Sequence, residues 1–177
     1  MPAQPPNAVV VVPVAALSDA EREALADLLV AVVAEGASVG FLPPLDRERA
    51  RAYWAGKPGP GELLLVARDG DAIVGTVQVQ PAESANGAHR AEIAKLLVHP
   101  EQRRRGIGRA LLAEAEMTAR AAGKTLLVLD TREGDPSNDL YRAAGWIEAG
   151  RVPKWAKAAD GRLAGTVFYF KDVSPGT

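Results

Sequence analysis

A short stretch in the second half of the chain constrains the fold more than any other feature. An apolar segment ending at Val98 runs into a basic loop with two glycines, Gly106 and Gly108, and a segment with helical periodicity follows at once. Glycines allow a positive φ and let a ligand approach the main chain. The first N–H groups of the helix lack an intrahelical acceptor, and the helix dipole is positive at the same end. Strand, loop and helix together predict a site for a pyrophosphate.

Three other interpretations compete for this loop. A P-loop needs Gly-Lys-Ser/Thr at the helix start, where this chain has Gly108-Arg109-Ala110. A Rossmann fingerprint needs a small residue where Leu111 stands, and it needs a strand that begins a parallel βαβ series. The third is a solvated run of charges ahead of an ordinary helix. The joint fit of strand, glycine spacing and helix to an anion site favours the pyrophosphate.

The composition excludes several kinds of site. The 177 residues suffice for one domain that buries a core without a disulfide or a metal. The chain has no cysteine, so a thiol nucleophile and a thiolate metal site are excluded. Its two histidines, His89 and His99, are too few for a His-rich zinc site, and no metal is expected.

Charge and hydropathy narrow the class of partner. Lys and Arg number 21 against 22 Asp and Glu, a net charge of −1, which argues against a nucleic-acid binder. No apolar run approaches the ~20 residues that span a bilayer. The first seven residues have no basic region before an apolar stretch, unlike a signal peptide. We therefore expect a soluble, cytoplasmic protein with no membrane partner.

Periodicity and turn signals predict one α/β domain over residues 9–173, behind a disordered tail at 1–8. An Asp-Gly turn at 69–71 joins two strands as a hairpin, so much of the sheet is expected to be antiparallel. A turn-rich insert is expected between the last two strands. The predicted strands are 9–14, 62–68, 72–80, 91–98, 126–129, 146–152 and 166–171, and the predicted helices are 18–36, 46–54, 108–122 and 136–145.

Two motifs resemble the GNAT superfamily of N-acetyltransferases. Arg103-x-x-Gly106-x-Gly108 resembles the family's acetyl-CoA loop, and Tyr141-x-x-x-Gly145-Trp146 resembles its Tyr-x-x-x-Gly-Phe segment. The order of elements agrees over nearly the whole chain. The resemblance implies a single-domain GNAT-like fold with a mixed, mostly antiparallel sheet flanked by helices. It also implies a cofactor cleft where two central strands, ending near Val98 and Leu129, splay apart.

Shorter segments resemble the tabtoxin-resistance acetyltransferase group within this superfamily. They are 36–41, 86–87, 90–92 with 95–96, 129–131, 160–163 and 169–171.

The resemblance makes acetyl-CoA the expected cosubstrate, with its pyrophosphate on the basic loop and its pantetheine arm along the preceding strand. Many family members carry an asparagine at the start of the tyrosine helix. This chain has Gly134-Asp135-Pro136 there, and Asn138 comes later. The predicted cofactor-binding residues are Leu96, Leu97, Val98, Arg103, Arg104, Arg105, Gly106, Ile107, Gly108, Arg109 and Asn138.

Direct acetyl transfer to an amine needs a base for the ammonium and a proton for the leaving thiolate. Tyr141 stands where the family places its thiolate-protonating tyrosine; packing in the core is the alternative. Asp130 ends an apolar strand, where a carboxylate is costly unless it is solvated or paired. Glu92 lies early in the cofactor-side strand. Each carboxylate is a candidate base or ammonium anchor; a strand-end cap and an outward surface charge are the alternatives.

The resemblance points to a small, amino-acid-like primary amine as acceptor, and so to detoxification of a toxin or antibiotic by transfer in a ternary complex. Glu92 and Asp130 could hold its ammonium, and Arg90 or Lys95 its carboxylate. The segment 154–162 is expected to form a loop that closes over such a ligand.

Two other functions remain open on sequence grounds. One is a non-catalytic CoA-binding module. The other is a serine hydrolase, because Ser38 lies in a Gly-x-Ser-x-Gly pattern, although a helix precedes it and a Pro-Pro break follows. Trp54 and Trp155 stand beside loops and are candidates to line the acceptor pocket. Monomer and homodimer are both compatible with the sequence.

Overall fold

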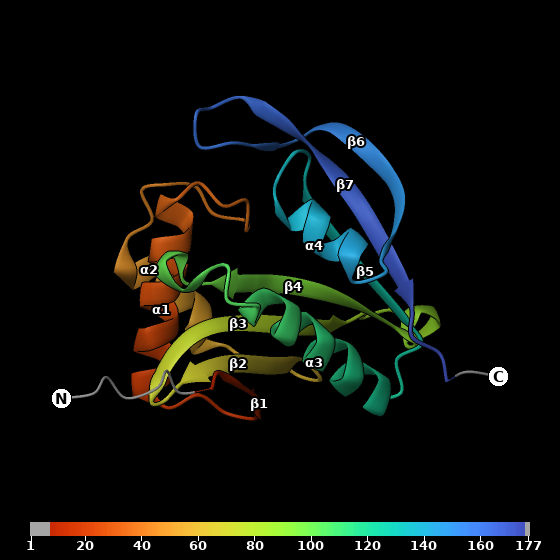
Figure 1. The fold of residues 1–177 in the computed structure, drawn as a ribbon, viewed down its shortest axis with the longest axis horizontal. Helices are drawn as coiled ribbons and strands as arrows, with labels where there is room; N and C mark the ends of the chain where they lie inside the picture. The colour runs from red at the N-terminus through yellow and green to blue at the C-terminus, as the bar shows by residue number, and fades with distance from the viewer. Residues whose placement is uncertain (1–7, 176–177) are drawn as a thin grey trace.

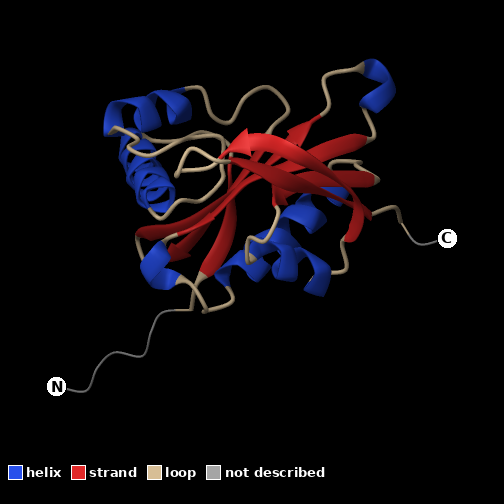
Figure 2. Cartoon of the chain, turned by 90° about the horizontal axis from the view of Figure 1, so that it is seen from above, coloured by secondary structure: helices blue, strands red, loops and turns tan. Residues whose placement is uncertain are grey.

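In the computed structural model, which describes residues 8–175, a twisted seven-stranded sheet carries helices on both faces (Figures 1 and 2). The strand order is β1-β2-β3-β4-β5-β7-β6, and every pair is antiparallel except β4 with β5. The predicted α/β class with a mostly antiparallel sheet is confirmed. Of the predicted tail, residues 1–7 lie outside the described part of the chain.

The elements follow the predicted order. The strands are β1 (Val10–Val14), β2 (Leu63–Asp69), β3 (Ala72–Pro81), β4 (Arg90–Val98), β5 (Leu126–Arg132), β6 (Ile147–Lys157) and β7 (Leu163–Asp172). The helices are α1 (Asp19–Ala34), α2 (Arg47–Ala55), α3 (Ile107–Ala121) and α4 (Ser137–Ala143), with short 3-10 turns η1 (Ala85–Gly87) and η2 (Pro100–Gln102).

Local chemistry sets the helix starts. Ser18 and Glu21 form the predicted capping box of α1, each side chain accepting a hydrogen bond from the other's backbone N–H. The Asp46 carboxylate accepts from the N–H of Arg49 at 2.7 Å and caps α2. The Asp135 carboxylate accepts from the N–H of Ser137 at 2.9 Å and orients the start of α4.

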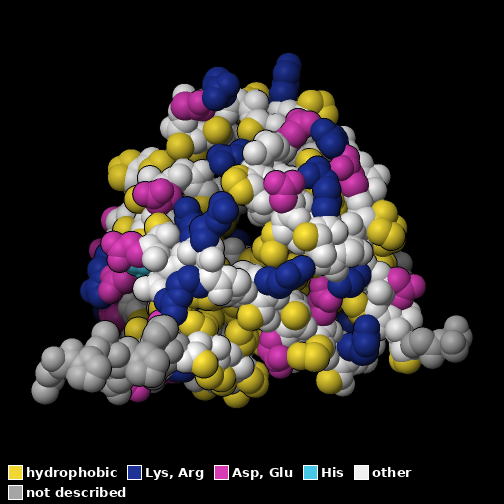
Figure 3. Space-filling model, viewed as in Figure 1, with side chains coloured by type: hydrophobic (Ala, Val, Ile, Leu, Met, Phe, Trp, Pro, Cys, Tyr) yellow, Lys and Arg dark blue, Asp and Glu magenta, His cyan; other side chains and the backbone are white. Residues whose placement is uncertain are grey.

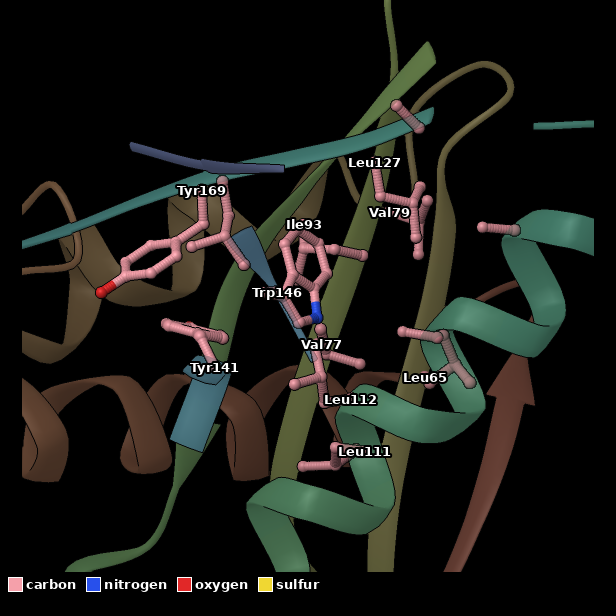
Figure 4. Close-up of a cluster of buried hydrophobic side chains, with 14 of the residues drawn as sticks. Leu65, Val77, Val79, Ile93, Leu111, Leu112, Leu127, Tyr141, Trp146 and Tyr169 are labelled. Atoms are coloured by element: carbon pink, nitrogen blue, oxygen red, sulfur yellow. The ribbon is translucent and has the colours of Figure 1, made fainter. Parts of the chain in front are cut away.

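Two hydrophobic clusters hold the helices against the sheet. The cluster beneath α3 joins that helix to the central strands and to α4, and Tyr141, Trp146 and Tyr169 close one end of it (Figure 4). The cluster on the opposite face packs α1 and α2 on β2 and on Leu97, around the fully buried Trp54. The prediction that Trp54 lines the acceptor pocket is therefore wrong, because its ring is enclosed by the core.

The expected loop at 154–162 is also wrong. The last hairpin is longer than predicted, with Ala156 paired to Ala164 and Lys157 to Leu163, so only residues 158–162 form the turn. Pro153 is tolerated within β6 because β6 is the edge strand and needs no donor on its free side. Trp155 stays on this hairpin, half exposed, with its ring against Phe168 at a centroid distance of 5.3 Å.

Candidate active site

The parallel pair β4 and β5 separates soon after it forms. Only Arg90, Ala91 and Glu92 pair with β5, opposite Leu126, Leu127 and Val128. Beyond this point the two strands diverge, and α4 lies over the opening (Figure 1). The molecular surface is hollowed here, with Lys and Arg side chains on both sides (Figure 3). From Ile93 onward, the edge of β4 that faces β5 has no strand partner in the described chain, so its backbone groups are free for a ligand.

The basic loop and the start of α3 border this opening. Arg104 and Gly106 adopt positive φ values of 64° and 78°, and Gly106 is the N-cap of α3. The first backbone bond of the helix runs from the N–H of Ala110 to the carbonyl of Gly106. The N–H groups from Arg104 to Arg109 have no acceptor among the described residues. A row of free donors at the positive end of a helix dipole can bind a pyrophosphate.

The arginines of the loop divide into two sets. The guanidinium of Arg105 donates to Asp69 at 3.1 Å and also to Gln102, so it braces the loop against the β2–β3 turn. Arg103, Arg104 and Arg109 are exposed and pair with no carboxylate of the described residues. These three arginines are the ones free to meet an anion.

The strand residues predicted to line the pantetheine also differ from one another. Leu96 and Val98 pack at the edge of the α3-side cluster and remain partly accessible. Leu97 points the other way, into the α1 and α2 core, so only its backbone can reach a cofactor. Ile107 is buried and anchors α3. A Cβ at Gly108 would lie 3.6 Å from Leu140 and 3.7 Å from Val98, ordinary contact distances.

Tyr141 lies on α4, beside the opening. Its side chain is 6% exposed and packs against Trp146 and Tyr169, with ring centroids 6.1 and 5.9 Å away. No hydrogen bond joins its hydroxyl to any described residue. Burial raises the pKa of this phenol, and the charges of Asp135 and Asp130 raise it further. The hydroxyl therefore keeps its proton near neutral pH and is available as a hydrogen-bond donor or general acid.

Glu92 and Asp130 share one face of the sheet at the point where the strands separate. Glu92 is the last paired residue of β4, opposite Val128, and Asp130 is two residues further along β5. The Glu92 side chain is accessible to water, but neighbouring protein atoms partly desolvate its carboxyl group. This burial raises the pKa of Glu92, and the negative charge of Asp130 adds to the shift. Asp130 accepts a hydrogen bond from Thr166 at 2.7 Å, through one carboxylate oxygen.

A model of the acetyltransferase (GNAT) family matches residues 25–146, more than half of the chain. The chain belongs to the GNAT acetyltransferase family. It is 36% identical over 104 residues to an uncharacterized N-acetyltransferase in the hisH–hisA intergenic region of Azospirillum brasilense. The matched segment covers 57% of this chain and 62% of that relative, so the chain spans less than two thirds of the relative's length.

Solved structures share the GNAT fold over the full chain. The structure of yncA from Salmonella typhimurium with its cofactor acetyl-CoA has a TM-score of 0.78 at 20% identity, covering 96% of both chains. An N-acetyltransferase from Staphylococcus aureus has a TM-score of 0.82 at 16% identity, covering 95% of this chain and 100% of the other. At these identities the likeness establishes the fold.

Asn138 departs from the predicted GNAT site. Its side chain is buried, and its amide donates to the carbonyls of Arg132 and Asp135 at 2.9 and 2.8 Å. Its carbonyl oxygen accepts from the hydroxyl of Tyr169 at 2.9 Å. Both hydrogens of the amide are committed to holding α4 on β5. We therefore leave Asn138 out of the proposed cofactor site.

The serine-hydrolase alternative finds no support in the geometry. Ser38 lies in the loop after α1, with no strand before it and no helix directly after it, so it cannot form a nucleophile elbow. Within residues 8–175, no group of three His, Cys, Asp or Glu side chains could hold a metal ion. No helix in the same part of the chain is long and apolar enough to cross a membrane.

Sequence reasoning missed a polar cluster on the α2 side of the opening. The hydroxyl of Tyr53 donates to Gln78 at 2.8 Å, and Gln80 donates to Gln78 and to Glu62 at 3.0 and 3.1 Å. Burial raises the pKa of Tyr53 to about 12. Alternation of polar Thr76, Gln78 and Gln80 along a strand was the available signal, because buried polar side chains on one face need partners.

Proposed function

We propose that this GNAT protein transfers an acetyl group from acetyl-CoA to the primary amine of a small, amino-acid-like molecule. The observation that carries the proposal is the convergence of three groups at one opening. Glu92 and Asp130 share a face at the split of the strands, and Tyr141 lies on the helix over it. The free N–H groups at the start of α3 fit a pyrophosphate, so acetyl-CoA is a suitable cosubstrate for the same opening.

The roles follow from the protonation states. Acetyl-CoA supplies the thioester. Glu92, with its raised pKa, takes a proton from the acceptor's ammonium, and Asp130 keeps that region negative. The freed amine attacks the thioester carbonyl carbon, and the carbon–sulfur bond breaks. Tyr141 donates its hydroxyl proton to the departing thiolate. The nitrogen then loses its second proton to solvent, which leaves a neutral amide, and solvent returns a proton to Tyr141. The transfer is direct and needs no covalent enzyme intermediate, consistent with a chain that has no cysteine.

The acceptor class follows from the charges around the opening. Two carboxylates can hold an ammonium, and a lysine, Lys95, lies on the same strand as Glu92. Arg90, the other predicted carboxylate partner, lies over η1, with its Nη2 3.2 Å from the position of a Cβ at Gly87. Acetylation would remove the positive charge of the amine. The segments that resemble the tabtoxin-resistance group support a toxic amino acid as the molecule neutralised.

The test is an acetyl-CoA consumption assay against amino acids, aminoglycosides, polyamines and peptides. Turnover with small amino acids or their toxic analogues, abolished in Gly108→Glu, is the expected result. Efficient acetylation of peptide N-termini or lysine tails alone would overturn the acceptor class. Tight binding of acetyl-CoA without turnover of any amine would instead identify a non-catalytic CoA-binding module.

A further inference from the structure

Lys95 stands at an irregularity in β4. Thr76 pairs with Leu97 and Gln78 pairs with Ala94, so two residues of β4, Lys95 and Leu96, face the single Val77 of β3. This is a β-bulge, which re-aims side chains. Ala91 and Ile93 point into the α3-side cluster, and strict alternation would send Lys95 there too. The bulge, with a φ of 49° at Lys95, turns its side chain to the opposite face instead.

The ammonium of Lys95 ends over the ring of Tyr53, with Nζ 5.6 Å from the ring centroid. It also lies near Gly40 of the α1–α2 connection, 3.6 Å from the position of a Cβ there. No carboxylate of the described residues comes within 4.0 Å of this Nζ, and no described residue accepts a hydrogen bond from it. A half-buried ammonium without a partner is costly. Among the described residues, the ammonium of Lys95 therefore has no direct ion-pair or hydrogen-bond partner at this opening.

A second donor without a partner lies beside it. Gln78 is fully buried and sits opposite Ala94, the neighbour of Lys95. Its Oε1 accepts from both Tyr53 and Gln80, which fixes the orientation of the amide. Its Nε2 has no hydrogen-bond partner in the part of the chain that the structure describes. Buried polar atoms without partners are rare in folded proteins, and each one requires an explanation.

None of the neighbouring carboxylates among the described residues accepts a hydrogen bond from the Nζ of Lys95 or the Nε2 of Gln78. Glu62 accepts from Lys57 at 3.0 Å through both oxygens, from Gln80 at 3.1 Å and from the N–H of Gly59 at 2.7 Å. Lys57 and Glu62 thus neutralise each other. Glu92 and Asp130, the other carboxylates whose charges reach Lys95, do not pair with it. Within residues 8–175, Lys95 therefore has carboxylates nearby but no carboxylate in direct contact with its Nζ.

We propose that Lys95 binds the carboxylate of the acceptor, so that the enzyme selects amino acids over amines that lack an acid group. The inference rests on the proposed acetyl transfer and names its specificity determinant. Glu92 is three residues from Lys95 on one strand, a separation of roughly 10 Å or less between Cα atoms. The side chains of Glu92 and Lys95 can therefore hold, between them, the ammonium and the carboxylate of one small zwitterion.

The test compares paired acceptors that differ only in the carboxylate. The pair is the amino acid turned over fastest in the panel and its decarboxylated amine. Lys95→Met removes the charge and keeps most of the side-chain length. It should raise the KM for the amino acid, lowering kcat/KM roughly 10- to 100-fold and leaving the amine within about 3-fold. Lys95→Arg should restore part of the preference for the amino acid.

Two controls isolate the subsite. Lys124→Met removes a distant lysine whose Nζ donates to the carbonyl of Ala88, and it should leave both acceptors unchanged. Acetyl-CoA affinity, measured by calorimetry, should be the same in Lys95→Met and wild type. An unchanged preference for the amino acid in Lys95→Met, with normal wild-type turnover, would overturn the subsite while the acetyl transfer stands.

A binding measurement separates the two proposals. L-leucine and isoamylamine are titrated by calorimetry into wild type and Lys95→Met, each saturated with CoA. Leucine binding that is weakened in Lys95→Met, with isoamylamine unaffected, supports the subsite even if no acetyl transfer is detected. Equal binding of leucine by both proteins counts against it, whatever the turnover.

Discussion

The two halves of the site are built in different ways. The cofactor half comes from one continuous stretch, Leu96 to Arg109, whose geometry is set by two positive-φ residues and a helix start. The acceptor half draws on α2, β3, β4, β5 and the α1–α2 connection, and its side chains meet across long sequence separations. Tyr53 and Gln78, joined by a hydrogen bond, are 25 residues apart. One half depends on local backbone and the other on side chains brought together by the fold.

The charged groups of the two halves also differ in how far they are exposed to water. The free arginines of the cofactor half are exposed, so water and salt screen them and single replacements have small effects. The acceptor half holds groups whose pKa values are displaced by burial, including Glu92, Lys95 and Tyr53. Changes to backbone shape should therefore affect cofactor binding, and changes to single charges should affect the acceptor and the chemistry.

The largest effect is expected from Gly108→Glu. A carboxylate at the start of α3 would repel the phosphates at the free N–H groups, weakening acetyl-CoA binding by roughly 100-fold or more. Calorimetry gives the affinity directly. Gly108→Ala is the matched control, because its Cβ meets only ordinary contacts, and it should bind acetyl-CoA within a few-fold of wild type. Undiminished affinity for acetyl-CoA in Gly108→Glu would contradict the assignment of the cofactor site to this loop and the start of α3.

Glu92→Gln tests the acceptor half by removing the base. A general base contributes roughly 100-fold or more, so kcat/KM should fall by that order with acetyl-CoA affinity unchanged. In wild type the base must be ionised, and its pKa is raised. Activity should therefore fall, as pH decreases, at a pH above the ordinary range of a glutamate. A pH–rate profile measures this acidic limb.

Asp130→Asn tests whether Glu92, and not Asp130, is the general base. Because the charge of Asp130 raises the pKa of Glu92, its removal should shift the acidic limb to lower pH without abolishing it. Loss of the limb in Asp130→Asn, with the limb retained in Glu92→Gln, would reverse the two roles.

Tyr141→Phe is expected to have a smaller effect that falls on kcat. Loss of the proton donor should lower kcat by roughly 10- to 1000-fold with little change in acetyl-CoA affinity. The hydroxyl bonds to no described residue, so the melting temperature should barely change. Wild-type turnover in this variant would assign protonation of the thiolate to water.

The smallest effect is expected at a hydrogen-bonded brace within the acceptor half. Arg132, at the end of β5, donates to the carbonyl of Gly36 at 3.0 Å and to Asp135 at 3.1 Å, which ties the α1–α2 connection across the opening. Arg132→Met should raise the acceptor KM by roughly 3- to 10-fold with acetyl-CoA affinity unchanged. Steady-state kinetics with both substrates varied gives the two constants. Arg142→Met, at an exposed ion pair, is the control and should change neither.

The sequence by itself determined the order of the elements, the mixed sheet and the glycine-containing loop that opens α3. Each of these depends on neighbours along the chain: a capping box at Ser18, glycines at 106 and 108, an apolar strand directly before a helix. These features depend on local propensity and on hydrogen bonding within a few residues, which a sequence pattern can reveal. Tyr141 and the two carboxylates are candidates from the sequence because of their places in a motif or in a predicted strand, and their roles stay predictions.

Only the tertiary structure decided which side chains share the opening. Trp54 looked like a pocket residue beside a loop, yet packing against α1 and β2 buries it completely. Lys95 reaches the acceptor face because a bulge in the β3–β4 register reverses the alternation of β4. Pairing register and packing depend on residues tens of positions away, and a shift by one residue moves every later side chain to the other face of the sheet. Local sequence patterns do not reveal such a shift in strand register.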